Sequence, residues 1–156
     1  MSAPPAGPAA ADLQPQLDPT HLAVVRYPAD WQPPGAVPPD TAAPNTAGPA
    51  FFAMIRGEHE VTVVAPETML DDPAWSDRAE QVDRAWRRVT FPGPLPWELV
   101  GFLADVAGRL AGAQIPFTSM SGFTTDHVLV RAAQADLAVA VLSGQEPPPQ
   151  RPGTNP

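Results

Sequence analysis

The stretch SMSGFTTDHVLV, residues 119–130, has the pattern of two β-strands joined by a tight turn. Asp126 stands at the start of the second strand, immediately before an apolar run. An amphipathic segment, 96–112, precedes this hairpin and a second helical pattern, 133–142, follows it. Helix, strand, strand and helix in this order make half of a ferredoxin-like unit. The stretch therefore predicts an α+β fold with antiparallel sheets.

The helix expected over 96–112 has one regular apolar stripe. Leu99, Leu103, Val106 and Leu110 recur at spacings of four, three and four residues. That spacing places the four side chains on one helical face. We therefore expect this face to be buried against the sheet.

The rest of the chain suggests a second copy of the same pattern. Strands are expected at 21–27, 51–56, 61–65, 85–91, 116–121 and 124–131, with a short helix at 76–82. Divided near residue 84, the order gives two ferredoxin-like halves, 20–84 and 85–145. In the first half a proline-rich loop, 28–49, takes the place of the first helix. This repeat rests on the pattern of elements, because the two halves share no evident sequence similarity.

Proline usage marks the two ends of the chain. The sequence has 156 residues, of which 23 are proline. Residues 1–19 and 146–156 are rich in proline and lack apolar periodicity, so we expect both to be disordered tails.

Charge and cysteine content limit the classes of partner. The formal net charge is −8, which disfavours binding to the phosphates of a nucleic acid. One basic cluster, Arg84, Arg87 and Arg88, is either an exception or a solvated strand edge. The absence of cysteine excludes disulfides and thiolate metal sites. No signal-peptide pattern and no long apolar run are present, so we expect a cytoplasmic protein with no membrane partner.

Catalytic and metal-binding patterns are weak. His21, His59 and His127 are far apart and show no metal-ligand spacing. No nucleophile-elbow, phosphate-loop or dinucleotide-binding motif occurs. The sequence thus predicts a protein that is no enzyme and has no cofactor and no metal site.

The start of the helix and the hairpin together resemble a receptor for a zwitterion. The N–H groups of Leu95, Trp97 and Glu98 would open the helix without intrahelical partners and could hold a carboxylate. Asp126 could bind an ammonium or another cation. Neutral hydrogen bonds could come from Ser119, Ser121 and Thr124.

Each of these residues also has a purely structural interpretation. Asp126 could serve only to stabilise its own turn, and the serines and threonines could do the same. Trp97 could be a core or lid residue, and Glu98 suits the positive end of a helix dipole.

Three segments carry a resemblance to a known family. They are FFAMIRGEHEVTVVAPE (51–67), FPGPLPWELVGFLADVAGRLAGAQI (91–115) and TSMSGFTTDHVLV (118–130). The chain resembles tandem ACT-domain proteins related to the CASTOR arginine sensors, in their stand-alone bacterial form. The resemblance implies a regulatory protein that binds an amino acid between modules, near the turn after the first strand and the start of the next helix. The family usually shows a Thr-Asp pair at the positions of Thr125 and Asp126, and we include both among the predicted ligand-binding residues.

The resemblance leaves homo-oligomer formation open. A second interpretation is an interaction module without a ligand, in which the sheet edges mediate dimerisation or docking. A pocket that brings Asp126, the 93–98 turn and the serines together would favour the first interpretation over the second.

Overall fold

The chain folds as two compact units joined through two long strands. The structure, a computed structural model, describes residues 10–35, 51–97 and 99–145. The N-terminal unit is Asp18–Arg88, and the C-terminal unit combines Met1–Leu17 with Val89–Pro156. Strands β1 (Gln16–Pro28) and β4 (Gln81–Phe91) each contribute residues to both units. The boundary therefore falls inside secondary-structure elements rather than in a linker.

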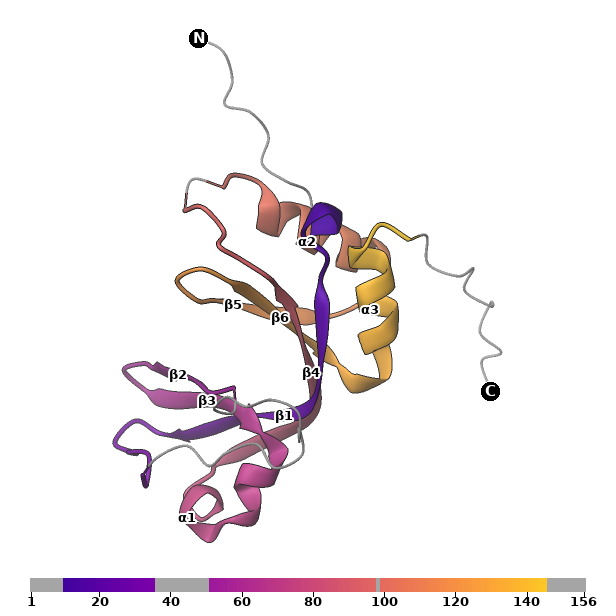
Figure 1. Cartoon of the computed structure of the whole chain (residues 1–156). Helices are drawn as coiled ribbons and strands as arrows, with labels where there is room; N and C mark the ends of the chain where they lie inside the picture. Colours follow the sequence, from indigo (N-terminus) through magenta and orange to yellow (C-terminus); the bar gives the residue numbers. More distant parts are fainter. Residues whose placement is uncertain (1–9, 36–50, 98, 146–156) are drawn as a thin grey trace, which may run out of the picture. The chain divides into compact units, whose positions relative to one another are not determined.

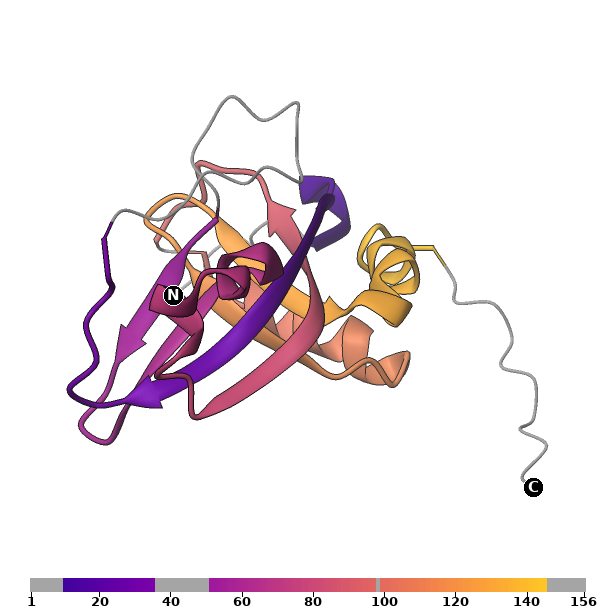
Figure 2. The same cartoon turned by 90° about the horizontal axis from the view of Figure 1, so that it is seen from below.

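The N-terminal unit is built on a sheet with the strand order β2-β3-β1-β4. Strand β2 is Ala53–Arg56 and strand β3 is Glu60–Pro66. Both the β1–β3 and the β2–β3 pairs are antiparallel, and β1 and β4 run side by side within this unit (Figure 2). The valine-rich run of β3 suits a pleated, buried surface. The antiparallel pairs confirm the expected antiparallel sheet in this unit.

Aromatic side chains fill the core of the N-terminal unit. The rings of Tyr27 and Trp31 stack with their centroids 3.9 Å apart, and both side chains are buried. The Tyr27 hydroxyl donates a 2.7 Å hydrogen bond to the carbonyl of Trp75. Burial raises the pKa of Tyr27 to about 12, so this hydroxyl keeps its proton under ordinary conditions.

The short helix predicted at 76–82 is wrong. Instead, the 3₁₀-helix η2 (Glu67–Asp71) leads into helix α1 (Pro73–Ser76), and residues 81–82 already belong to β4. Asp72 is the N-cap of α1, because its side chain accepts a 2.9 Å hydrogen bond from the N–H of Ala74. Proline at the first helical position is pre-organised for a helix start. The cap is thus Asp72 rather than Ser76, which ends the helix.

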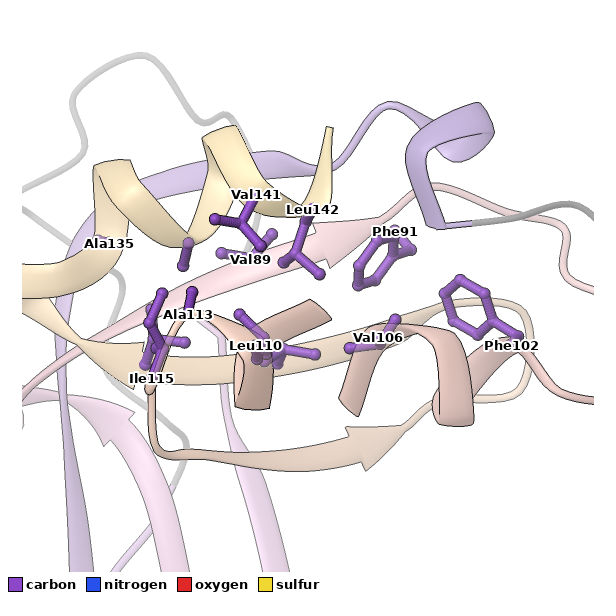
Figure 3. Close-up of a cluster of buried hydrophobic side chains, with 13 residues drawn as sticks. Val89, Phe91, Phe102, Val106, Leu110, Ala113, Ile115, Ala135, Val141 and Leu142 are labelled. Carbon is purple, nitrogen blue, oxygen red and sulfur yellow. The ribbon is translucent and has the colours of Figure 1, made fainter. Parts of the chain in front are cut away.

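The C-terminal unit places two helices against a sheet with the strand order β4-β6-β5. Strands β5 (Phe117–Ser121) and β6 (Asp126–Arg131) form the expected antiparallel hairpin. Helix α2 is Phe102–Gly112, and helix α3, Ala135–Leu142, follows the 3₁₀-turn η3 (Ala132–Gln134). Side chains from both helices and from β4 meet in one buried cluster (Figure 3).

The buried face of α2 differs from the expected one. Phe102, Val106 and Leu110 are buried, whereas Leu103 is 43% exposed. Leu99 precedes the helix and packs against the core as a half-buried side chain. The helix begins six residues later than predicted, so the stripe that faces the core runs through 102, 106 and 110 at i, i+4 spacing.

Part of the predicted N-terminal tail is folded. The 3₁₀-helix η1 (Ala10–Leu13) and the first residues of β1 lie inside the range expected to be disordered. Leu13 and Leu17 pack against the core of the C-terminal unit. Residues 10–19 therefore contribute apolar contacts to the fold. The rest of that tail, 1–9, and the tail 146–156 lie outside the described residues.

The arginine cluster on β4 makes specific contacts within the N-terminal unit. Arg88 pairs with the carboxylate of Asp18, and its guanidinium lies 4.2 Å from the centroid of the Phe51 ring. Arg87 donates a 2.8 Å hydrogen bond to the carbonyl of Asp18. Nη1 of Arg84 lies 3.9 Å from Oε2 of Glu67. The expectation of a solvated strand edge is wrong for Arg88, which is mostly buried.

Asp18 should make the stability of the N-terminal unit depend on pH. Burial raises the pKa of Asp18, but hydrogen bonds from the Thr20 N–H and from Arg88 outweigh it, so the pKa lies below its usual value. A depressed folded-state pKa contributes stability above the unfolded-state pKa, and this is lost as the pH falls. We expect Asp18→Asn to be less stable than the natural protein at pH 7, with the difference shrinking below about pH 4.

Urea unfolding of both proteins at pH 7 and at pH 3 measures this change. Asp30→Asn is the control, because Asp30 forms an exposed pair with Arg78. Such a pair is worth at most about 1 kcal/mol. If the free energies of unfolding of Asp18→Asn and of the natural protein differed by the same amount at both pH values, the lowered pKa of Asp18 would be contradicted.

Candidate functional site

The loop before α2 is kept out of the helix by its prolines and ends at a glycine. Pro92, Pro94 and Pro96 have no N–H group, and each disfavours helical geometry in the residue before it. Gly101 is the N-cap of α2 with φ 86°, a left-handed conformation that suits glycine. The helix start predicted at 95–98 is therefore wrong. Glu98 lies outside the described residues.

This loop is fixed to the turn of the hairpin. The N–H of Leu95 donates a 3.0 Å hydrogen bond to the carbonyl of Thr124, so it is not available for a ligand as predicted. A Cβ atom on Gly93 would lie 1.7 Å from the same carbonyl oxygen. The backbone of the loop can approach the turn this closely only with glycine at position 93.

The face of the hairpin that packs against the helices also carries Asp126 near its turn. Asp126 pairs with Ser121 across the ladder, and Ser119 pairs with Val128. Side chains alternate along a strand, so Asp126 shares a face with Val128, which belongs to the helix-packed core. The turn closes with a 2.8 Å hydrogen bond from the N–H of Gly122 to the carbonyl of Thr125. Asp126 thus lies where the core face of the hairpin meets the loop.

The loop, the start of α2 and the hairpin turn enclose a cleft of about 280 Å³. This is close to the lower end of the volumes of small-molecule pockets, roughly 300–1,000 Å³. Of the predicted site residues, the cleft brings together Leu95, Trp97, Ser121, Thr124, Thr125 and Asp126. Ser119, an exposed residue farther along β5, is not among the described lining residues.

The cleft also contains a helix start that the sequence interpretation placed elsewhere. Gly101, Phe102, Leu103 and Ala104 line it. The first backbone bond of α2 runs from the N–H of Asp105 to the carbonyl of Gly101, at 2.9 Å. The N–H groups of the three residues before Asp105 belong to the first turn, where intrahelical partners are missing. The signal for this start was Gly101, a residue type accepted at N-caps, just ahead of an apolar run.

The cleft combines one charged side chain with exposed aromatic rings at its rim. Asp126, half-buried, is the one charged side chain among the described lining residues. Trp97 and Phe123 meet edge to face with centroids 5.4 Å apart, one from the loop and one from the turn. They are 70% and 80% exposed, respectively. The site thus combines an acidic group with an open apolar rim.

Thr125 is partly committed to another contact. Its hydroxyl lies 3.2 Å from Nε2 of His127, and Nδ1 of that ring lies 3.0 Å from the hydroxyl of Thr90 on β4. One of the hydrogen-bonding positions of Thr125 is therefore used inside the protein.

A second hollow, of about 330 Å³, lies in the N-terminal unit. Its charged lining residue Glu67 accepts a 2.5 Å hydrogen bond from the N–H of Ala85, which has a left-handed φ of 63°. The carboxylate therefore stabilises an unusual backbone conformation within β4. This role gives Glu67 a structural explanation that needs no ligand.

Comparison with known proteins agrees with the fold described for the C-terminal unit. Residues 81–144, from β4 to the end of α3, match the family described as ACT domain. No curated protein matches the chain in sequence. In the described residues, no helix is long and apolar enough to cross a membrane.

Solved structures with a similar fold cover most of the chain. A protein from Agrobacterium tumefaciens aligns with TM-score 0.58 and 23% identity, over 80% of this chain and 82% of that one. A Vibrio cholerae protein of unknown function, described as a possible transport protein, aligns with TM-score 0.55 and 18% identity, over 83% of this chain and 87% of that one. The ligand-free regulatory subunit of aspartate kinase from Thermus thermophilus aligns with TM-score 0.55 and 14% identity, over 83% of this chain and 95% of that one. At these identities the likeness supports the ferredoxin-like ACT fold.

Proposed function

We propose that the C-terminal unit is a non-catalytic regulatory module that binds an amino acid in the cleft beside Asp126. The observation that carries this proposal is the convergence of the first turn of α2 and Asp126 on one cleft. The match of residues 81–144 to the ACT domain supports a regulatory role. The aspartate kinase regulatory subunit among the structures of similar fold is consistent with that role.

The two ends of the cleft suit the two charges of an amino acid. The first-turn N–H groups of Phe102, Leu103 and Ala104, with the helix dipole, would hold the α-carboxylate. Asp126 would take the α-ammonium group or a cationic side chain, and the hydroxyls of Ser121 and Thr124 would add neutral hydrogen bonds. The carboxylate position proposed here is therefore 102–104 instead of 95–98.

A tandem arrangement of two ACT-like halves is the finer proposal for the whole chain. In the N-terminal unit the first, third and second strands are neighbours in the order β1-β3-β2, and in the C-terminal unit the order is β4-β6-β5. The same topology in both units supports a structural repeat. Among its described residues, the first half has no helix between β1 and β2. A cytoplasmic location remains a prediction.

Asp126→Asn should weaken binding of the amino acid by about 1.5–3 kcal/mol, the range for a hydrogen bond to a charged group. A thermal-shift screen of the twenty amino acids identifies the ligand, because a ligand bound only by the folded state raises the Tm. Calorimetric titration of the natural protein and the variant then measures the loss of affinity. Asparagine has nearly the same shape as aspartate, and the turn is closed by the backbone hydrogen bond from Gly122 to Thr125, so the fold should remain intact.

The matched control is Asp136→Asn, which removes an exposed carboxylate from the first turn of α3. It should leave the affinity unchanged. Equal affinity of Asp126→Asn and the natural protein would remove Asp126 from the site.

A ligand-free interaction module is the second candidate function. Trp97, Val100 and Phe123 are all strongly exposed and come from the loop and turn that border the cleft. Exposed apolar residues gathered in this way can mark a protein-binding surface. A screen in which none of the twenty amino acids raises the Tm would favour this second function, including self-association into a homo-oligomer.

A further inference from the structure

The cleft brings several aromatic rings together with a single carboxylate. Trp97, Phe102 and Phe123 all line it together with Asp126. No described lining residue carries a positive charge. A carboxylate attracts a cation through its charge, and an aromatic ring attracts one through the quadrupole of its face.

The three rings differ in how firmly they are held. Phe102 is buried and meets Phe91 edge to face, with centroids 4.9 Å apart. Trp97 and Phe123 contact each other from two segments that the Leu95–Thr124 hydrogen bond ties together. Their high exposure leaves much of their ring surface open to a bound molecule. One fixed ring and two open rings therefore surround a space that also contains a carboxylate.

The hydrogen-bond acceptors of the cleft are partly used already. A primary ammonium group has three donors to satisfy. The carbonyls of Thr124 and Thr125 accept from Leu95 and Gly122, and the Thr125 hydroxyl is in contact with His127. An ammonium whose hydrogens are replaced by methyl groups needs no such acceptors. Its positive charge is spread over apolar surface that suits ring faces.

We propose that the ligand of this cleft carries an N-alkylated, quaternary ammonium group, held between Asp126 and the rings of Trp97 and Phe123. This inference rests on the proposed function for the location of the ligand and specifies its chemical class. The methyl groups contact the rings, and the carboxylate of Asp126 balances the charge.

Two probes of equal charge test this class. L-lysine and Nε,Nε,Nε-trimethyl-L-lysine differ only in three methyl groups on the side-chain nitrogen. Calorimetric titration of the full chain should show binding of the trimethylated probe about 10-fold tighter than that of lysine, within the range of a partly desolvated cation–π contact. Trp97→Leu should reduce this ratio toward one, whereas Asp126→Asn should weaken the binding of both probes.

Val100→Ala is the control variant, because Val100 is an exposed residue of the same loop that does not line the cleft. It should leave the ratio unchanged. Equal affinity for the two probes would overturn the inference and leave the proposed amino-acid site standing. Binding of tetramethylammonium without binding of any amino acid would support the quaternary class and contradict the amino-acid ligand. No binding of any of these three probes would also overturn the inference, and the separate thermal-shift screen of the twenty amino acids would then decide whether the amino-acid site stands.

Discussion

Replacing Leu110 by alanine should lower the free energy of unfolding by about 2–5 kcal/mol, the range for emptying a fully buried leucine site. Leu110 is completely buried in the core of the C-terminal unit, between the side chains of α2, α3 and β4 (Figure 3). Its loss removes apolar contacts and leaves a cavity that the surrounding side chains fill only in part. Urea unfolding followed by circular dichroism measures the change in midpoint. Helices α2 and α3, which supply part of this core, are labelled in Figure 1.

Leu103→Ala provides the matched control on the same helix. The chemical change is identical, but Leu103 is 43% exposed, so less buried surface is lost than at the fully buried Leu110. We expect a change within about 0.5 kcal/mol, as for other surface substitutions. Similar losses in the two variants would mean that the buried face of α2 is assigned incorrectly.

The start and face of α2 show where local patterns stop being sufficient. Apolar residues occur at both 102 and 103, and either one can start an apolar stripe that continues through 106 and 110. The choice between them depends on where the helix begins. Gly101, in a left-handed conformation, and the prolines before it set that point. Leu99 is thereby left in the loop, and Phe102 takes the first core position.

The hairpin could be predicted because its signals are local. Strand alternation and a short polar turn containing glycine lie within residues 117–131, and the structure places β5 and β6 there. Strand β1 is different. It begins at Gln16, in a segment with little apolar periodicity. Its length depends on pairing with strands distant in sequence, which local propensity does not encode.

The candidate site contains residues that local sequence signals predict and residues that depend on contacts distant in sequence. Asp126 follows from turn chemistry that is visible in the sequence. The hydrogen bond between Leu95 and Thr124 joins residues almost thirty positions apart, so the sequence alone gave no reason to remove that N–H from the site. Gly101 and Phe102 also line the cleft without having been predicted to do so. They reach it because the loop folds back on the hairpin before the helix starts, which local sequence patterns do not show.

Gly93→Ala should disrupt this fold-back and lower the free energy of unfolding by about 2–4 kcal/mol, from steric overlap and a lost hydrogen bond together. The added Cβ would lie 1.7 Å from the carbonyl oxygen of Thr124, which is backbone and cannot move aside as a side chain can. To relieve the overlap, the loop must move away from the turn. That movement breaks the bond between Leu95 and Thr124 and opens one side of the cleft.

Binding should therefore be lost together with stability, and the same calorimetric titration that tests Asp126 measures it. Gly108→Ala is the matched control, because a Cβ at this position of α2 meets nothing within 4 Å. Alanine there should raise stability by about 0.5–1 kcal/mol, since glycine is unfavourable inside a helix. If Gly93→Ala kept both the unfolding midpoint and the affinity, the loop would not depend on close contact with the turn. The cleft would then owe its shape to α2 and the hairpin alone.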